Sequence, residues 1–218
     1  MKKISWWLPG LVFLFAACTS SKITSTNAPQ NNEQKNFYRV LVLGLVKSDD
    51  TQLQAKMENH LAGDMKALGY SVVTSLGEYG PRAFKGMTEE QVLAKLKGSN
   101  IDAVVTIVLL NKKVEKQFVP AHPNRANEQQ FQHLFWDYYD AINNRVFEPG
   151  YYVDNTEYYW ESNLFEMNKQ SLLYSVKTTS FNPANTESLA HHYGKMIVKS
   201  MKKEHVLQSD PAPAKKGF

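Results

Sequence analysis

The sequence predicts an α/β domain whose mixed sheet joins a parallel β-α-β-α-β part to an antiparallel hairpin, with helices flanking the sheet. Three observations predict this class. Between residues 37 and 76, two short apolar segments enclose a helical repeat of apolar side chains. A strongly apolar segment follows at 101–110. Two further segments, at 151–167 and 171–181, are separated only by a short polar turn, which is the pattern of a hairpin.

Length and composition suit one globular domain. The chain has 218 residues, of which 43% are hydrophobic and 21% charged, too apolar for a disordered chain and too short for two full-sized domains. One cysteine excludes an intrachain disulfide framework and a zinc site built on several thiolates. From residue 18 onward, 23 basic side chains face 21 acidic ones, so the charge gives no case for a nucleic-acid partner.

The N-terminus has the pattern of an export signal. Lys2 and Lys3 precede an apolar run of about 14 residues that ends at Ala17, short of the roughly 20 residues that cross a bilayer as a helix. Residues 1–17 are therefore predicted to be a signal peptide. The run FAAC, which ends at Cys18, resembles the lipobox of bacterial lipoproteins, with phenylalanine where leucine is more usual.

The lipobox resemblance implies a lipid anchor at Cys18. In that family the cysteine sulfur receives a diacylglycerol, the chain is cleaved before the cysteine, and the new amine is acylated. Thr19 follows, where an aspartate would imply retention in the inner membrane, so the resemblance implies the outer membrane. The alternatives are an ordinary signal peptide and an uncleaved anchor. Residues 18–36 contain one sizeable aliphatic side chain and are predicted to be a flexible tether.

The domain is predicted to open with strand, helix and strand. Residues 37–46 (FYRVLVLGLV) predict a buried strand. The polar residues 48–50 offer N-cap side chains for a helix that ends at Gly69, and 70–76 predict the second strand. The helix carries one apolar stripe, formed by Leu53, Met57, Leu61, Met65 and Leu68. Short joins between these elements predict a parallel pair of strands.

The second helix and the central strand come next. After a loop at 77–86, residues 88–91 (TEEQ) form a capping box that opens a helix ending at Gly98. Residues 101–110 (IDAVVTIVLL) predict a central strand covered on both faces. Beyond Asn111 the pattern becomes amphipathic, which predicts that this strand continues past the edge of the sheet.

The C-terminal part is predicted to be a hairpin and a helix. Asn182 and Pro183 are expected to cap the last helix. Its buried face is expected to contain Leu189, Tyr193, Ile197 and Met201. The domain thus spans 37–207, and 208–218 form a polar tail.

Four segments carry a resemblance to known proteins: RVLVLGL at 39–45, LGY at 68–70, IDAVVTIVLL at 101–110 and SNLFEMNKQSLLYSVKT at 162–178. They resemble small bacterial lipoproteins with a body similar to the N-terminal domain of the Tol translocation protein. That group includes lipoprotein activators of penicillin-binding proteins and the curli-secretion lipoprotein. The resemblance covers most of 37–205 and implies a binding or assembly module, with no catalytic residues carried over.

Motifs of the common enzyme classes are absent from the sequence. It contains no G-x-S-x-G, H-E-x-x-H, G-x-x-x-x-G-K or G-x-G-x-x-G, and no cofactor is predicted. Glu187 and His191 lie one turn apart on the last helix, as metal ligands do. Lys195 stands where a second histidine would be needed, so we expect an exposed helix face and no metal site.

A carboxylate-dependent glycan hydrolase of the cell envelope is the alternative function. Glu157 and Glu161 share one face of a predicted strand, about 13 Å apart, whereas glycosidase pairs lie roughly 5 to 9.5 Å apart. Asp137 and Asp140 come nearer if their segment is helical, and they could face Glu157 across the fold. No feature of the sequence places these carboxylates together.

Aromatic density is the strongest anomaly in the sequence. Residues 131–160, predicted to be an insertion, contain 11 aromatic residues, where the chain average of 12% predicts between three and four. The segment is also acidic, which disfavours stacking on single-stranded nucleic acid. Either the aromatics pack in a hairpin core, or they form an exposed platform. The candidate contact residues are Trp136, Tyr138, Tyr139, Tyr151, Tyr152, Tyr158 and Trp160.

The leading hypothesis is a non-enzymatic envelope lipoprotein. The Cys18 lipid attaches it to the membrane, and the 131–160 insertion binds a partner protein or cell-wall glycan.

Overall fold

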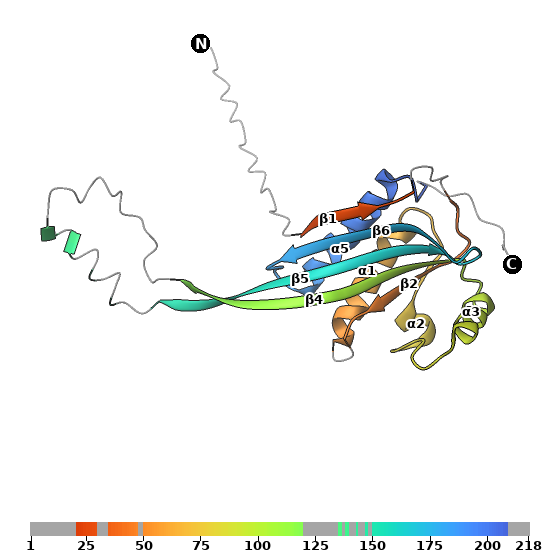
Figure 1. The fold of residues 1–218 in the computed structure, drawn as a ribbon, viewed down its shortest axis with the longest axis horizontal. Coiled ribbons are helices and arrows are strands. Elements are labelled where there is room, and N and C mark those ends of the chain that lie inside the picture. Colours follow the sequence, from red (N-terminus) through yellow and green to blue (C-terminus); the bar gives the residue numbers. More distant parts are fainter. Residues whose placement is uncertain are drawn as a thin grey trace, which may run out of the picture.

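A mixed six-stranded sheet forms the centre of the protein, with strand order β1-β6-β5-β4-β2-β3 (Figure 1). The computed structural model describes residues 21–29, 35–47, 50–119, 135–136, 138–139, 143, 147 and 150–208. The elements are β1 (Ser21–Asn27), β2 (Val40–Leu45), α1 (Thr51–Lys66), β3 (Val72–Thr74), α2 (Ser75–Tyr79), α3 (Glu89–Gly98), β4 (Ala103–Val119), β5 (Tyr151–Glu166), β6 (Ser171–Phe181) and α5 (Thr186–Lys203). The predicted fold class is confirmed.

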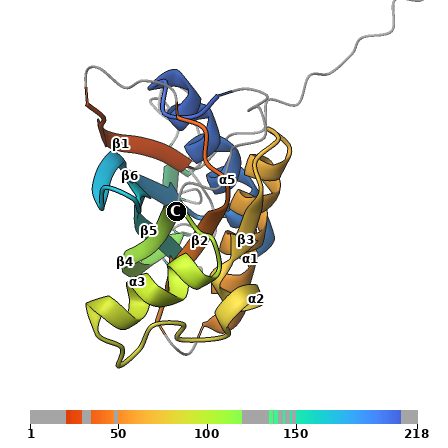
Figure 2. The same ribbon diagram turned by 90° about the vertical axis from the view of Figure 1, so that its right-hand side faces the viewer.

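The parallel and antiparallel parts of the sheet meet at β4. Strand β2 pairs in parallel with both β3 and β4, while β4, β5 and β6 form an antiparallel series. Because β3 and β4 lie on opposite sides of β2, right-handed crossovers place α1 and α3 on opposite faces of the sheet. Figure 2 shows this layering with the sheet seen toward its end.

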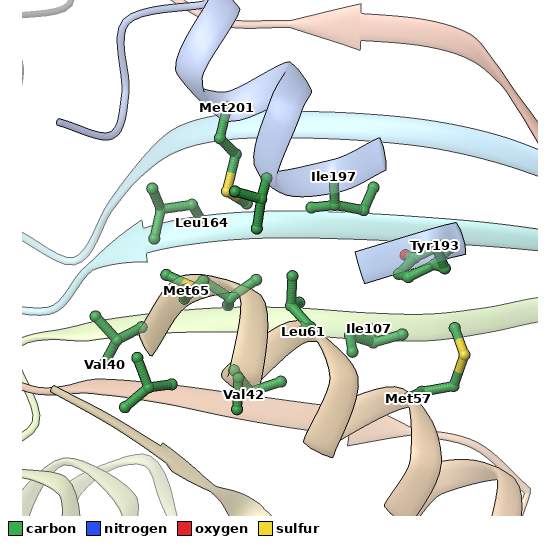
Figure 3. Close-up of a cluster of buried hydrophobic side chains, with 14 of the residues drawn as sticks. Val40, Val42, Met57, Leu61, Met65, Ile107, Leu164, Tyr193, Ile197 and Met201 are labelled. Atoms are coloured by element: carbon green, nitrogen blue, oxygen red, sulfur yellow. The ribbon is translucent and has the colours of Figure 1, made fainter. Parts of the chain in front are cut away.

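The main core lies between the sheet and the helix pair α1 and α5. The side chains of both helices point toward the strands, as Figure 3 shows for Met57, Leu61, Tyr193 and Ile197. The two predicted apolar stripes are buried, apart from Leu68, which is partly buried. A smaller core covers the other face, where Leu96 of α3 packs with Leu41, Ile101 and Val104. Burial of both faces explains the continuous apolar run of β4.

Local capping explains where the helices begin. The Asp50 side chain accepts a hydrogen bond from the Leu53 amide at 3.1 Å, and the predicted capping box between Thr88 and Gln91 is formed. The predicted cap of the last helix is wrong. Asn185 caps α5, accepting from the Ser188 amide at 2.8 Å, because the chain first turns through Asn182 at a φ of 42°.

The strand predicted at 70–76 is shorter than expected. Only Val72–Thr74 is extended, and the chain then turns directly into α2. The Thr74 hydroxyl accepts a hydrogen bond from the Gly77 amide at 3.2 Å, which caps this short helix. The loop predicted at 77–86 therefore begins inside a helix.

The predicted tether contains a strand and is corrected in that part. Ser21–Asn27 forms β1 and pairs antiparallel with β6, so that Ser21 lies opposite Ser180. Its side chains are mostly exposed, and only Ile23 is a sizeable aliphatic. Backbone hydrogen bonds to the edge of β6 hold this strand. Such bonds need no apolar side chains, so the polar composition of the segment did not predict a strand.

No helix within the described part of the chain combines the length and hydrophobicity needed to span a membrane.

Candidate contact surface

Strands β4 and β5 continue together beyond the sheet. Strand β2 pairs with β4 only over 103–108, and β6 pairs with β5 only over 157–166. Residues 109–119 and 151–156 therefore project beyond the rest of the sheet, and where 114–119 pair with 151–156 only two strands remain; we call 109–119 and 151–156 the ribbon (Figure 1). Along the described strands, no third strand pairs with its outer edges. The predicted continuation of the central strand past the sheet is confirmed.

One face of the ribbon continues the core face of the sheet. Along β5 the even-numbered side chains from Tyr158 to Leu164 are buried, and the same face runs outward to Tyr152. The β4 residues directly opposite lie on the same face: Val114 is opposite Thr156, and Phe118 is opposite Tyr152. Here none of the described helices covers the face. The side chains of Val114, Phe118 and Tyr152 are consequently exposed.

The outer end of the ribbon is a small aromatic cluster. The Phe118 and Tyr152 rings meet edge to face, with centroids 5.3 Å apart. Gly150 allows this packing, because a Cβ there would lie 2.3 Å from Phe118 Cζ and 2.5 Å from the Val119 carbonyl oxygen. Tyr151 and Val119 pair directly beside them. The cluster is thus built by cross-strand register and one close glycine contact.

Five of the seven predicted contact residues are exposed. Trp136 is 72% exposed and Tyr152 68%, and the other three also lie on the surface. These three are Tyr138, Tyr139 and Tyr151. The rings of Phe135, Trp136 and Tyr139 contact one another at centroid distances of 5.6–5.9 Å.

Two predicted contact residues belong to the core, and their assignment to the surface is corrected. Trp160 is fully buried and Tyr158 is 7% exposed. Their rings stack at 6.0 Å, and Trp160 also packs against Tyr193 of α5 at 5.6 Å. They lie on the face of β5 that α1 and α5 cover. The predicted insertion at 131–160 therefore overlaps a strand of the sheet from residue 151 onward.

Three ribbon residues of β4 were not among the predicted contact residues. Leu110, Val114 and Phe118 are each about half exposed. The available signal was the amphipathic pattern beyond Asn111, combined with a following strand of nearly equal length. Pairing with Tyr151–Glu166 carries this part of β4 beyond the rest of the sheet, where these three side chains are exposed.

Charges on the ribbon are balanced. The Lys113 ammonium lies 2.5 Å from a Glu115 carboxylate oxygen, and this hydrogen bond raises the pKa of Lys113. The Tyr159 hydroxyl, at the base of the ribbon, donates to Glu157 Oε2 at 2.7 Å, which raises the pKa of that hydroxyl. The Lys112 ammonium lies over the Tyr158 ring, 5.4 Å from its centroid.

The carboxylates of the hydrolase alternative are engaged with surface neighbours. Glu161 Oε1 accepts from Asn163 Nδ2 at 2.9 Å, and Glu161 Oε2 lies 3.7 Å from the Lys177 ammonium. Glu157 is held by Tyr159. Asp137 and Asp140 lie outside the described residues, as does Cys18. Among the described residues, the contacts of Glu157 and Glu161 do not favour a hydrolase.

Glu187 and His191 lie at the contact between α1 and α5. Glu187 Oε1 is 2.5 Å from His60 Nε2, and the ring of His191 packs edge-on against His60 at 5.5 Å. The hydrogen bond from His60 lowers the pKa of Glu187. Within the described ranges, no group of three or more His, Cys, Asp or Glu side chains is arranged to hold a metal ion.

A pocket of about 350 Å³ lies at the C-terminal end of β2, lined in part by Gly44, Gln54 and Ser75. Beside it the fully buried Glu58 carboxylate accepts from the side chains of Gln54 and Ser75 and from the amides of Gly44 and Leu76, at 2.7–3.0 Å. These four donors satisfy the carboxylate within the fold. Glu58 therefore joins β2, α1 and α2, which is a structural role.

Comparisons with known proteins show distant structural likenesses. No protein-family model matches the sequence, and no curated protein is similar to it. The chain is similar to PelC from Paraburkholderia phytofirmans, whose structure is a dodecamer, at 10% identity over 90% of this chain and 99% of that chain, with a TM-score of 0.42. Lipoprotein GNA1162 from Neisseria meningitidis is 14% identical over 76% and 98% of the respective chains, with a TM-score of 0.43.

A third similar structure is a neuraminyllactose-binding hemagglutinin homolog from Helicobacter pylori. It is 12% identical over 82% of this chain and 97% of that chain, with a TM-score of 0.38. Identities and TM-scores in this range assign neither a family nor a function. The structures found include a lipoprotein, and they do not show the resemblance to the Tol and penicillin-binding-protein-activator group.

Proposed function

We propose that this chain is a lipid-anchored, non-enzymatic binding or assembly module of the bacterial cell envelope. Cys18 attaches it to the outer membrane, the α/β body is the scaffold, and the ribbon with the exposed aromatics of 135–147 is the contact surface. The observation that carries the proposal is the ribbon itself, which places apolar and aromatic side chains in solvent beyond the sheet.

Physical chemistry supports a binding role for the ribbon. An isolated two-stranded segment is at best marginally stable in water, and its open edges invite pairing with other chains. Exposed apolar surface of this kind marks contact sites, and tyrosine, tryptophan and phenylalanine are enriched in such sites. A partner protein and a cell-wall glycan both suit aromatic side chains. Without a partner, the ribbon would expose apolar side chains and open strand edges that promote aggregation.

Site-specific photo-crosslinking in cells tests this proposal. A photoreactive phenylalanine analogue replaces Phe118 on the ribbon, and a matched variant carries it at Leu172, which is also exposed but lies near the opposite end of β6. We expect one or more discrete adducts from position 118, with a protein, a glycan or a membrane lipid, and none from position 172. Adducts of equal yield at both positions, or none at either, would refute the contact surface.

A further inference from the structure

The start of β1 marks the level at which the ribbon leaves the sheet. Ser21 lies opposite Ser180 of β6, and Ser180 lies opposite Tyr158 of β5. These three residues form one row across the sheet. From this row β1 runs away from the ribbon, to Asn27 opposite Ser175, while β5 extends toward the ribbon through Thr156. The chain before Ser21 therefore enters the domain at its ribbon end.

Chain length then limits where the lipid can be. Three residue steps separate Cys18 from Ser21, and they span about 11 Å at most. From the same row the ribbon extends six residues to Tyr152, a distance of about 20 Å. The outer end of the ribbon thus lies on the anchored side of the body. Measured from that row, the outer end of the ribbon extends at least as far as Cys18 can.

The side chains at that end suit a lipid surface. Phe118, Tyr151 and Tyr152 are exposed, and rings of this kind collect where headgroups meet acyl chains. The ribbon's own charge does not oppose the contact, because the ribbon and its base contain three lysines (Lys112, Lys113, Lys116) and three acidic residues (Glu115, Asp154, Glu157). A balanced charge predicts binding through the rings, with little dependence on anionic lipid.

We infer that the outer end of the ribbon docks on the phospholipid bilayer that holds the Cys18 lipid. Phe118, Tyr151 and Tyr152 lie in the headgroup region, so that the anchor and the ribbon hold the body at two points. This inference rests on the proposed anchor, and it names the bilayer as the partner of the ribbon. The open strand edges at 109–119 and 151–156 keep the ribbon from inserting into the hydrocarbon core of the bilayer, because unpaired backbone groups are costly there.

Quenching of tryptophan by brominated phospholipids tests the docking. After removal of residues 1–17 the chain retains Trp136 and the buried Trp160. In a Trp136→Phe background, Tyr152→Trp reports on the ribbon and Leu172→Trp on the opposite end of the body. The acylated proteins are reconstituted in phosphatidylcholine vesicles and collected by flotation, and labelled palmitate is measured in each sample.

Docking predicts strong quenching of the indole at position 152, greater for bromines near the headgroup than near the chain end. The indole at position 172 should respond only to iodide in the water. If Tyr152→Trp perturbs the ribbon, Tyr151→Trp gives a second reading from the adjacent residue, with Trp160 emission reporting an intact core. Replacing part of the phosphatidylcholine with an anionic lipid should change the quenching little.

Two results would overturn docking while leaving the anchor intact. In the first, palmitate is incorporated and both introduced indoles respond to iodide alone. In the second, the ribbon pairs with another copy, which gives position-118 crosslinks between protomers without lipid quenching. Absence of palmitate with loss of flotation would instead refute the anchor, and the docking that depends on it.

Discussion

Single contacts set the spacing between α1 and α5. A Cβ at Gly194 would lie 2.6 Å from Asp64 Oδ2 and 3.2 Å from the backbone of His60 and Leu61. The missing side chain allows α5 to approach α1 closely over the main core. Gly63 lies on α1 itself but has open space around it. The two glycines therefore have different roles, although both are helical.

Substituting these glycines should shift stability in opposite directions. Gly194→Ala overpacks a backbone contact and should lower the free energy of unfolding by about 1–3 kcal/mol. Gly63→Ala should raise it by about 0.5–1 kcal/mol, because alanine is the better helix former and reduces the entropy of the unfolded chain. Urea denaturation of the two variants gives both values. Equal effects would show that α1 and α5 do not meet at Gly194.

Aromatic residues within the 131–160 segment should differ sharply in their contribution to stability. Trp160→Ala empties a fully buried site and should cost about 3–5 kcal/mol. Changing Trp136, Tyr138 and Tyr139 together to alanine should cost little, since surface substitutions usually stay within about 0.5 kcal/mol each. Thermal melts separate these cases. A triple variant that unfolds near room temperature would place those three residues in a core.

Asp64 should destabilise the protein at neutral pH. Burial raises the pKa of its carboxyl, while His191, Lys195 and His60 act in the opposite direction. A raised pKa in the folded state means that the stability linked to protonation is complete below the unfolded pKa, about 4, and is lost as pH rises through the folded pKa. Asp64→Asn should therefore raise Tm at pH 7, with the difference shrinking toward pH 3. A lower Tm at pH 7 would show that pairing with the neighbouring cations outweighs burial.

Element by element, the sequence predicted what apolar periodicity and capping encode. The two amphipathic helices, the run at 101–110 and the hairpin all carry patterns that burial imposes on side chains. Strand β1 was missed because an edge strand held by backbone bonds needs no apolar pattern. Trp160 was misplaced because composition cannot show which face of a strand a helix covers. The ribbon depended on knowing that β4 and β5 are matched in register over their full length.

Strand β1 gives an element-scale prediction. If Ser21–Asn27 pairs with β6, amides of β1 that point toward β6 should exchange with solvent more slowly than those of an unfolded peptide. Protection should remain below that of the interior strand β2 (Val40–Leu45), since an edge strand frays more readily. Hydrogen exchange measured by mass spectrometry or NMR reads both strands at once. Exchange of all β1 amides at the rate of an unfolded peptide would contradict the strand and support a flexible tether over the whole of 18–36.

At the scale of the whole molecule, the short link between Cys18 and β1 changes what an anchor does. A tether of 19 residues would let the body move freely near the membrane, with a typical reach on the order of 25 Å. With β1 beginning at Ser21, only Thr19 and Ser20 separate Cys18 from the sheet. Under the proposed lipidation of Cys18, the body would be held with its ribbon end toward the bilayer, and the anchor would orient the proposed contact surface as well as retain it.

Two substitutions test the anchor and the membrane that receives it. Cys18→Ser removes the acyl acceptor, so palmitate incorporation should be lost and the protein should leave the membrane fraction, because two or three acyl chains are needed for stable attachment. Thr19→Asp keeps the acceptor and should retain the label while moving the protein from the outer to the inner membrane on a density gradient. The pair separates acylation from sorting. Continued palmitate labelling and membrane retention of Cys18→Ser would contradict the anchor, and an unchanged gradient position for Thr19→Asp would contradict the outer-membrane assignment alone.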